Sequence, residues 1–259
     1  MFEDLGLDES PKTRAAASRF SVSSDTDEVF TLAFKVLDEY FGPKSEMEQL
    51  SALVAWRAEP FRSTPMPGVV ARYHVALARD EHGEIAGARD ALIAYDPAQG
   101  DAVALLSHAR VLPDYRGSGL AGLLRAIVTP WAHEDAATLG YRPTDVVLVS
   151  EMESLNPNDP DSIRRLAAYN RAGFRALDPR RLRYLQPDFR VRPGAPWVAV
   201  PLQFCVRPTQ AFWPASRVRR VWSLINAIHG AYVSAAQLTD LQSRSVDRLG
   251  DEDVHLLPI

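Results

Sequence analysis

The hydrophobic and polar positions of this chain recur with two periods, which predict helices and strands. Apolar residues between Val29 and Tyr40 follow the spacing of an amphipathic helix, with Ser24 or Asp25 as its N-cap. A second short helix is expected over residues 45–56. Residues 70–78, 85–95 and 102–112 have the pattern of strands, and turns at DEHG and DPAQGD join them into an antiparallel meander.

The second half of the chain alternates helices with strands. Helical spacing returns over residues 120–131, where Pro130 is expected to kink the helix. The continuous β-branched run DVVLVS, residues 145–150, predicts a strand buried on both faces in the middle of the sheet. A helix over residues 161–171, closed by Gly173 in a left-handed conformation, and strands near 182–185 and 197–206 follow. The predicted fold class is α/β (α+β), a mixed, mostly antiparallel central sheet flanked by helices.

The pattern also suggests how the chain is organised. We expect an N-terminal tail over residues 1–19 with a short strand around Phe20 and Val22, one domain over residues 20–207, and a C-terminal helical extension over residues 208–259. An apolar stripe from Val218 to Tyr232 runs along the extension. The arginines beside it, Arg217, Arg219 and Arg220, are interpreted as a solvated face rather than a nucleic-acid patch.

Composition narrows the functional classes. A hydrophobic content of 46% and a charged content of 24% are typical of globular proteins. The acidic start MFEDLGLDES lacks the layout of a signal peptide, and no apolar run is long enough to span a membrane, so we expect a cytoplasmic protein without a membrane partner. A net charge of −4 gives no general attraction to nucleic acid. The single cysteine, Cys205, lies in an apolar run and is expected to be inert.

The segment VLPDYRGSGLAGLL is the strongest local signal for a binding site. A predicted strand ends there, glycines follow, and a helix begins, so backbone N–H groups at a helix N-terminus face whatever lies in the loop. Gly117 and Gly119 allow close approach of an anion, and Arg116 adds a fork of donors suited to phosphate. The loop therefore predicts a site for a phosphate-bearing ligand.

Two alternatives remain open on these residues alone. Gly117, Gly119 and Gly122 also match G-x-G-x-x-G, the motif of dinucleotide-binding folds, and would then indicate a nicotinamide-dependent oxidoreductase. The expected acidic partner is poorly placed, because Glu151 lies 29 residues beyond Gly122. The glycines also fit a tight turn without a ligand.

A second motif favours one reading of the loop. RGSGLA, with Arg116, Gly119 and Ala121 in the signature places, resembles the cofactor loop of the GNAT superfamily of acyl-CoA-dependent N-acyltransferases. YNRAGF, from Tyr169 to Phe174, is similar to that superfamily's Tyr-x-x-x-Gly-Phe. The resemblance implies that acyl-CoA, with acetyl-CoA as the expected donor, is bound by Val111, Arg116, Gly117, Ser118, Gly119, Leu120 and Ala121.

The same resemblance implies direct transfer of the acyl group to an amine acceptor, either a small molecule or a peptide. Tyr169, a phenol with a reference pKa of about 10, would act as the general acid that protonates the departing thiolate. Glu151 is the first choice for the base, and His108 and Asp90 are in reserve. No metal site is predicted. A non-catalytic acyl-CoA-binding module is the rival class, and the extension is expected either to cover the acceptor cleft or to form a homodimer contact.

Overall fold

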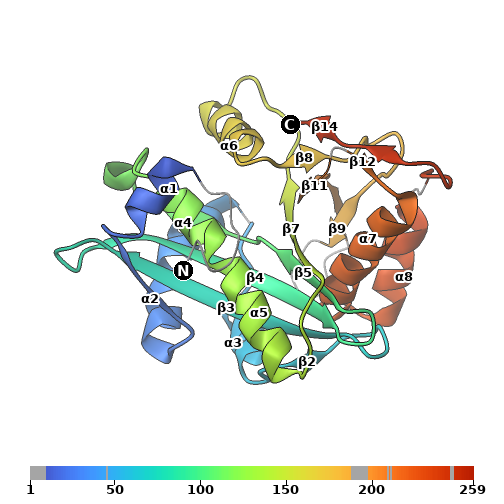
Figure 1. The fold of residues 1–259 in the computed structure, drawn as a ribbon, viewed down its shortest axis with the longest axis horizontal. Helices are drawn as coiled ribbons and strands as arrows, with labels where there is room; N and C mark the ends of the chain where they lie inside the picture. Colours follow the sequence, from blue (N-terminus) through green and yellow to red (C-terminus); the bar gives the residue numbers. More distant parts are fainter. Residues whose placement is uncertain (1–9, 45, 188–197, 209, 211, 246–247) are drawn as a thin grey trace.

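The computed structural model describes residues 10–44, 46–187, 198–208, 210, 212–245 and 248–259 (Figure 1). Its strands are β1 (Ser21–Ser24), β2 (Arg62–Ser63), β3 (Val70–Arg79), β4 (Ile85–Asp96), β5 (Asp101–Leu105), β6 (Ala109–Val111), β7 (Asp145–Met152), β8 (Arg175–Ala176), β9 (Leu185–Pro187), β10 (Ala199–Pro201), β11 (Gln203–Arg207), β12 (Phe212–Trp213), β13 (Val254–His255) and β14 (Leu257–Pro258). Its α-helices are α1 (Pro11–Ala16), α2 (Asp27–Phe41), α3 (Leu50–Arg57), α4 (Leu120–Ala126), α5 (Val128–Thr138), α6 (Pro160–Arg171), α7 (Ala215–Gly230) and α8 (Ala235–Arg244).

A ten-stranded mixed sheet forms the middle of the molecule, in the order β1-β3-β4-β5-β7-β11-β8-β14, with β2 beside β3 and β6 beside β4. Its strands pair antiparallel except for β5 and β7, which are parallel. The predicted fold class is confirmed, and so is the place of β7 in the middle of the sheet.

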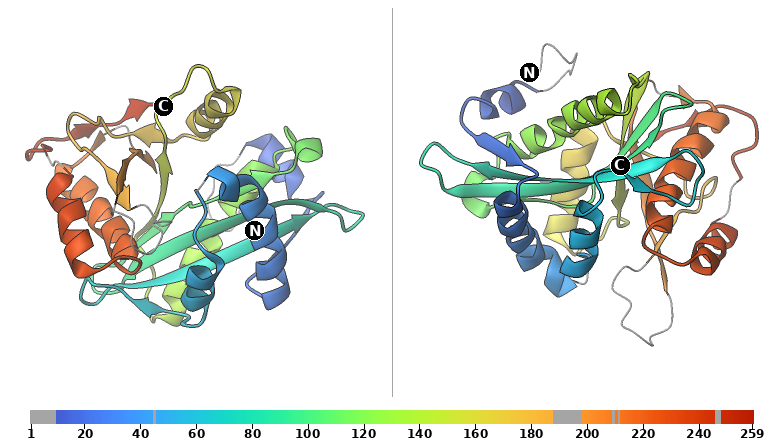
Figure 2. Two further views of the ribbon diagram at one scale, coloured as in Figure 1. Left: turned by 180° about the vertical axis from the view of Figure 1, so that it is seen from behind. Right: turned by 90° about the horizontal axis from the view of Figure 1, so that it is seen from below.

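Helices cover both faces of this sheet, which Figure 2 shows edge-on in its right-hand view. One buried apolar cluster joins α2, α3 and α7 to the odd-numbered residues of β3, such as Tyr73 and Val75. The other joins α1, α4, α5 and Leu166 of α6 to the opposite side of the same strands, including Ala76 and Ala78. Since successive side chains of a strand point to opposite faces, each strand contributes to both clusters. We call these two sides the α2/α7 face and the α4/α6 face.

The N-cap prediction for α2 is wrong. Thr26 caps the helix, its hydroxyl oxygen accepting the Val29 N–H at 3.2 Å. Asp25 has a left-handed backbone, φ 59°, and its carboxylate instead accepts the Val75 N–H at 3.1 Å and contacts His74. The carboxylate thus ties the start of the helix to β3.

The interruption expected at Pro130 is confirmed, but it lies three residues earlier. The predicted helix divides at Ile127 into α4 and α5, and Pro130 occupies the first turn of α5. A proline is tolerated there because N–H groups in the first turn have no intrahelical acceptor. Gly173 has the predicted left-handed conformation, with φ 85°, after α6.

The strand predicted over residues 102–112 is broken. From Leu105 to Ala109 the chain advances four residues while the partner strand advances three, from Leu92 to Arg89, so one extra residue forms a bulge. The side chain of Asp90 stabilises the bulge, because it accepts the His108 backbone N–H at 2.7 Å. The first part, β5, therefore pairs with both β4 and β7, whereas β6 pairs with β4 alone.

Both ends of the chain are more closely integrated than the sequence suggested. Helix α1 lies within the stretch predicted as a tail, and it packs on α4. After residue 208 the chain is largely helical as expected, yet α7 shares the core of the α2/α7 face and β14 extends the sheet beside β8. The division into domains stays a prediction. Residues 1–9 of the expected tail, Ser45 and Trp197 lie outside the described residues.

The arginines at the start of α7 do not form a purely solvated face. Arg217 lies 2.8 Å from Asp101, and Arg220 forms ion pairs with both Asp96 and Asp101. These contacts hold α7 against the turn between β4 and β5. In the described part of the chain no helix has both the length and the apolar character needed to cross a bilayer.

Candidate active site

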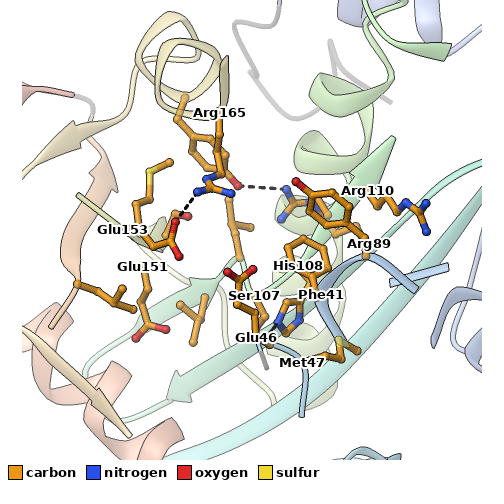
Figure 3. A pocket seen from close by; sticks show the side chains of 18 of the residues that line it. Phe41, Glu46, Met47, Arg89, Ser107, His108, Arg110, Glu151, Glu153 and Arg165 are labelled. Carbon is orange, nitrogen blue, oxygen red and sulfur yellow. Dashed lines mark hydrogen bonds and ion pairs between the residues drawn. The ribbon is translucent and has the colours of Figure 1, made fainter. Parts of the chain in front are cut away.

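A cleft opens where β5 and β7 stop pairing. The two strands run parallel from Asp101 and Asp145 to Leu105 and Val149, and the Leu106 N–H still reaches the Val149 carbonyl at 2.8 Å. Beyond that point β6 bends back to β4 while β7 continues beside β11. The two strand ends separate and leave a cavity of about 470 Å³ between them (Figure 3).

The cavity is lined from both faces of the sheet. Arg89 of β4 and Ser150 of β7 belong to the α4/α6 face, where Tyr169 of α6 contacts Arg89. Asp90 and Glu151 are their strand neighbours and therefore point to the α2/α7 face. Figure 3 shows Glu151 and Glu153 on one side of the space and Arg89 on the other. The opening in the sheet thus joins a cationic half to an acidic half.

The loop RGSGLA, residues 116–121, which we call the glycine loop, lies at the cationic half of the cavity. The N–H groups of Gly117, Gly119 and Ala121 have no acceptor within the described residues, whereas the Leu120 N–H donates to the Ser118 hydroxyl oxygen at 3.3 Å. Three N–H groups at alternate positions are therefore available to an anion at the start of α4.

The glycines serve different purposes. A Cβ on Gly119 would lie 2.2 Å from the Lys12 carbonyl oxygen, and one on Gly122 would lie 2.0 Å from the Thr13 hydroxyl, so both residues are glycine because α1 packs on α4. Gly117 has a φ of 77° and nothing within 4 Å of such a Cβ. The contact between α1 and α4 therefore explains Gly119 and Gly122 without a ligand, whereas the open space beside Gly117 remains for one.

The structure places some of the predicted cofactor residues at the wall of the cavity and others away from it. Val111, Arg116 and Ala121 line the cavity. The N–H of Val111 points away from β4, because the Leu112 N–H makes the bond to the Ala86 carbonyl at 2.9 Å and bonding alternates along an antiparallel strand. Leu120 is buried in the core of the α4/α6 face, so its side chain does not face the cavity.

Tyr169 and Arg89 form the centre of the cationic half. Arg89 is only 2% exposed, its Nε and Nη1 groups have no hydrogen-bond partner among the residues that the structure describes, and its Nη2 donates to the Tyr169 hydroxyl at 3.5 Å. Burial alone would raise the pKa of Tyr169, but the charge and hydrogen bond of Arg89, with Ser150 and Arg125, outweigh it and lower that pKa. The phenol is thereby a stronger acid than an ordinary tyrosine.

Glu151 lies in the acidic half, near the end of β7. Its Oε1 accepts a hydrogen bond from the Tyr184 hydroxyl and lies 2.9 Å from Nε2 of His229, on α7. Burial and the Glu151 carboxylate raise the pKa of Tyr184 well above its ordinary value, so the phenol stays protonated and donates. Glu153 is separate from this group, since it pairs with Arg165 at 2.7 Å (Figure 3).

His108 and Asp90, the reserve candidates, form a buried ion pair. Nδ1 of His108 lies 3.1 Å from both Asp90 oxygens, and Nε2 donates to the Glu46 carbonyl at 2.7 Å. Burial would lower the pKa of His108, but Asp90 and Glu48 raise it to about 10. An imidazolium with both N–H groups engaged has no lone pair to accept a proton at neutral pH.

The sequence analysis missed Arg89, Glu46, Glu48, Tyr184 and His229. Arg89 carried a signal, because a charged residue within the strand pattern of residues 85–95 has to face something polar. Glu46 and Glu48 lie in the irregular segment before α3, where no period predicts the direction of a side chain. No group of three or more His, Cys, Asp or Glu suited to a metal occurs among the residues that the structure describes.

No family model and no curated protein matches this sequence. Several solved structures resemble the fold at low similarity. A GCN5-related glucosamine N-acetyltransferase region of a fungal multi-domain β-N-acetylglucosaminidase is 18% identical, with a TM-score of 0.38 over 67% of this chain, which spans only 19% of that protein. The spermidine N-acetyltransferase of Vibrio cholerae, in complex with CoA and spermine, is 8% identical, with a TM-score of 0.41 over 73% of this chain and 95% of its own. The ribosomal-protein-S18-alanine N-acetyltransferase of Escherichia coli is 13% identical, with a TM-score of 0.42 over 73% and 93%.

The architecture is the one that the sequence predicted: a mixed, mostly antiparallel sheet flanked by helices. The dinucleotide alternative does not fit it. A dinucleotide-binding fold has a mostly parallel sheet, and only β5 and β7 pair parallel within the described strands. Because the similarities to solved structures are low, function has to be inferred from the site itself.

Proposed function

We propose that this protein is an N-acyltransferase that binds acyl-CoA, with acetyl-CoA as the expected donor, in the cationic half of the cavity and passes the acyl group to an amine in the acidic half. The observation that supports this most is the position of Tyr169. Its hydroxyl lies beside the buried cation Arg89, within a cavity that Arg116 and Ala121 of the glycine loop also line. An acid, a fixed positive charge and an anion-binding loop are what the departure of a phosphate-bearing thiol requires.

The residues present fit such a ligand. The free N–H groups of Gly117, Gly119 and Ala121 and the guanidinium of Arg116 would hold the diphosphate. The N–H of Val111, which points away from β4, would hold the acyl carbonyl or the pantetheine arm, and Ser118 shapes the turn through its bond to the Leu120 N–H. When bound, acetyl-CoA supplies a thioester whose carbon accepts the amine nitrogen and whose sulfur departs.

The chain's own residues would move two protons. Glu151 takes one from the ammonium, directly or through water, so that the nitrogen has a lone pair to attack with. As the carbon–nitrogen bond forms and the carbon–sulfur bond breaks, Tyr169 protonates the sulfur, and Arg89 stabilises the negative charge that passes through this position. The nitrogen then loses its second proton, which restores the phenol of Tyr169.

Titration with two families of cofactor tests the proposed site. We expect coenzyme A and acetyl-CoA to raise the melting temperature of the parent protein, whereas NAD does not, because ligands that bind only the folded state stabilise it. Arg116→Gln should weaken coenzyme A binding by roughly 10-fold, in line with the loss of one charged hydrogen bond. Arg142→Gln, a change of the same kind at an exposed position before β7, at the opposite end of that strand from the cavity, is the control. A response to NAD and none to coenzyme A would contradict the proposal.

The region after residue 208 has a proposed part in this site. Ile228, His229 and Tyr232 line the acidic half of the cavity. The C-terminal extension would therefore cover the acceptor side, which is one of the two roles expected for it from the sequence. A homodimer contact through the same helices is the other and stays a prediction.

A further inference from the structure

The acidic half of the cavity contains a buried carboxylate that lacks a hydrogen-bond partner. Glu48 is 6% exposed and lines the cavity, and its Oε2 accepts no hydrogen bond from the described residues. The nearest cation is the His108 ring, with Nδ1 at 3.8 Å, beyond hydrogen-bond range and already held by Asp90. A buried acceptor left unpaired is destabilising, so its partner is expected to arrive with a ligand.

The surroundings of Glu48 define the charge of that ligand. The groups that act on it come from every element packed around it: His108 from the β5–β6 connection, Asp90 from β4, Glu151 from β7, Tyr73 from β3 and Tyr232 after α7. The His108 cation is balanced by Asp90, and the tyrosines carry no charge because burial raises their pKa. Burial, with the nearby Asp90 and Glu151 carboxylates, raises the pKa of Glu48 despite the His108 cation, so this carboxyl group lacks a cation close enough to offset its burial.

A second carboxylate pair lies at the rim of the same half. Glu46 is exposed and lines the cavity together with Glu153. Burial and the proximity of Glu153 raise the pKa of Glu46, which is the effect of two like charges held close together. Arg165 neutralises one of the two through its 2.7 Å contact with Glu153. Lys44 also acts on Glu46, yet burial and Glu153 outweigh both cations and keep the pKa of Glu46 raised, so one negative charge at the rim is only partly compensated.

We propose that the acceptor is a diamine-type cation, whose reacting ammonium is held by Glu48 in the interior and whose second positive charge is held by Glu46 at the rim. This inference rests on the proposed function and adds the class of the acceptor to it. A primary ammonium supplies the donor that Oε2 of Glu48 lacks. A substrate with a carboxylate near its amine would bring a negative charge against Glu46 and Glu153 and is disfavoured.

Three amines of similar length test the proposal. Putrescine carries two ammonium groups, butylamine carries one, and γ-aminobutyrate replaces the second with a carboxylate. We expect kcat/KM, measured by coenzyme A release from acetyl-CoA, to be about 10- to 100-fold higher for putrescine than for butylamine, as expected for one charged hydrogen bond, and lowest for γ-aminobutyrate. Equal values for the three amines would overturn it.

Variants separate the two subsites. Glu48→Gln should lower kcat/KM about 100-fold for putrescine and butylamine alike, because both present the reacting ammonium. Glu46→Gln should reduce the ratio of putrescine to butylamine toward one. Glu134→Gln, the same change on the exposed side of α5, is the control. Acetyl-CoA binding and the melting temperature of each variant show whether it is folded.

Failure of the inference and failure of the proposed function give different results. If acetyl-CoA binds and amines release coenzyme A, but Glu48→Gln has the parent's kcat/KM with putrescine, the acceptor subsite is wrong and the transferase stands. If acetyl-CoA does not bind, or binds without release by any of the amines, the proposed function itself fails. Because Glu46 is exposed, its substitution also gives a result should Glu48→Gln not fold.

Discussion

Tyr169→Phe is expected to lower kcat by about 100- to 10,000-fold, the range attributed to a positioned general acid. The variant removes only the hydroxyl, so the ring keeps its edge contact with Phe174, 4.9 Å between centroids. The affinity for acetyl-CoA should stay within about 2-fold of the parent value, because Tyr169 gives up its proton in the reaction and not when acetyl-CoA binds. Stopped-flow measurement of thiol release, together with ligand titration, separates the two effects.

The pH dependence of the same pair of proteins gives a second readout. A general acid has to be protonated, so kcat of the parent should fall as pH rises through the pKa of Tyr169, which Arg89 holds below its ordinary value near 10. In Tyr169→Phe this alkaline decline should be absent. A variant that keeps the parent's rate and its alkaline decline would show that another group protonates the sulfur.

Arg89→Met is expected to raise stability while lowering activity. The guanidinium is buried with two N–H positions unpaired, and no carboxylate pairs with it among the described residues, so its removal should increase the free energy of unfolding by about 1–3 kcal/mol. At the same time the phenol of Tyr169 loses the charge that lowers its pKa, and the departing sulfur loses its stabilisation. We expect kcat to fall by roughly 10- to 1,000-fold, the range found on removing one oxyanion donor.

Arg110→Met is the matched control for that result. Arg110 also lines the cavity, but it is paired with Glu39 at 2.6 Å and donates to the Val36 carbonyl at 2.8 Å. Its replacement should therefore lower stability in urea unfolding rather than raise it. If Arg89→Met is also less stable than the parent, then Arg89 serves the fold, and its assignment to the departing sulfur loses its main support.

The sequence predicted the scaffold because the relevant signals are local. Periodicity located the strands β3, β4 and β7, and the strand-glycine-helix layout located the loop from Arg116 to Ala121. The strand predicted over residues 102–112 failed at a bulge, because the break depends on a tertiary contact, the side chain of Asp90 binding the backbone of His108. That bulge opens the cleft, so the cavity itself was not predictable from periodicity.

The acceptor side could not be predicted for a related reason. Glu46 and Glu48 precede α3, and His229 comes from α7, so only the tertiary fold brings these residues to the end of β7. Tyr169 and Glu151 could be selected from the sequence because each is tied to an element end with a recognisable pattern, and their catalytic roles stay predictions. The structure places them on opposite faces of the sheet, joined by the opening between β6 and β7.

The most direct test of acyl transfer is the parent protein incubated with acetyl-CoA and a panel of amines: a polyamine, an aminoglycoside, an amino acid and a lysine peptide. Coenzyme A release is followed by thiol reaction, and the acetylated product by mass. We expect release that depends on both protein and amine, in equal amounts with an N-acetylated amine, and fastest with the polyamine. Acetyl-CoA binding without an acetylated product from any amine would contradict the account and would indicate an acyl-CoA-binding module.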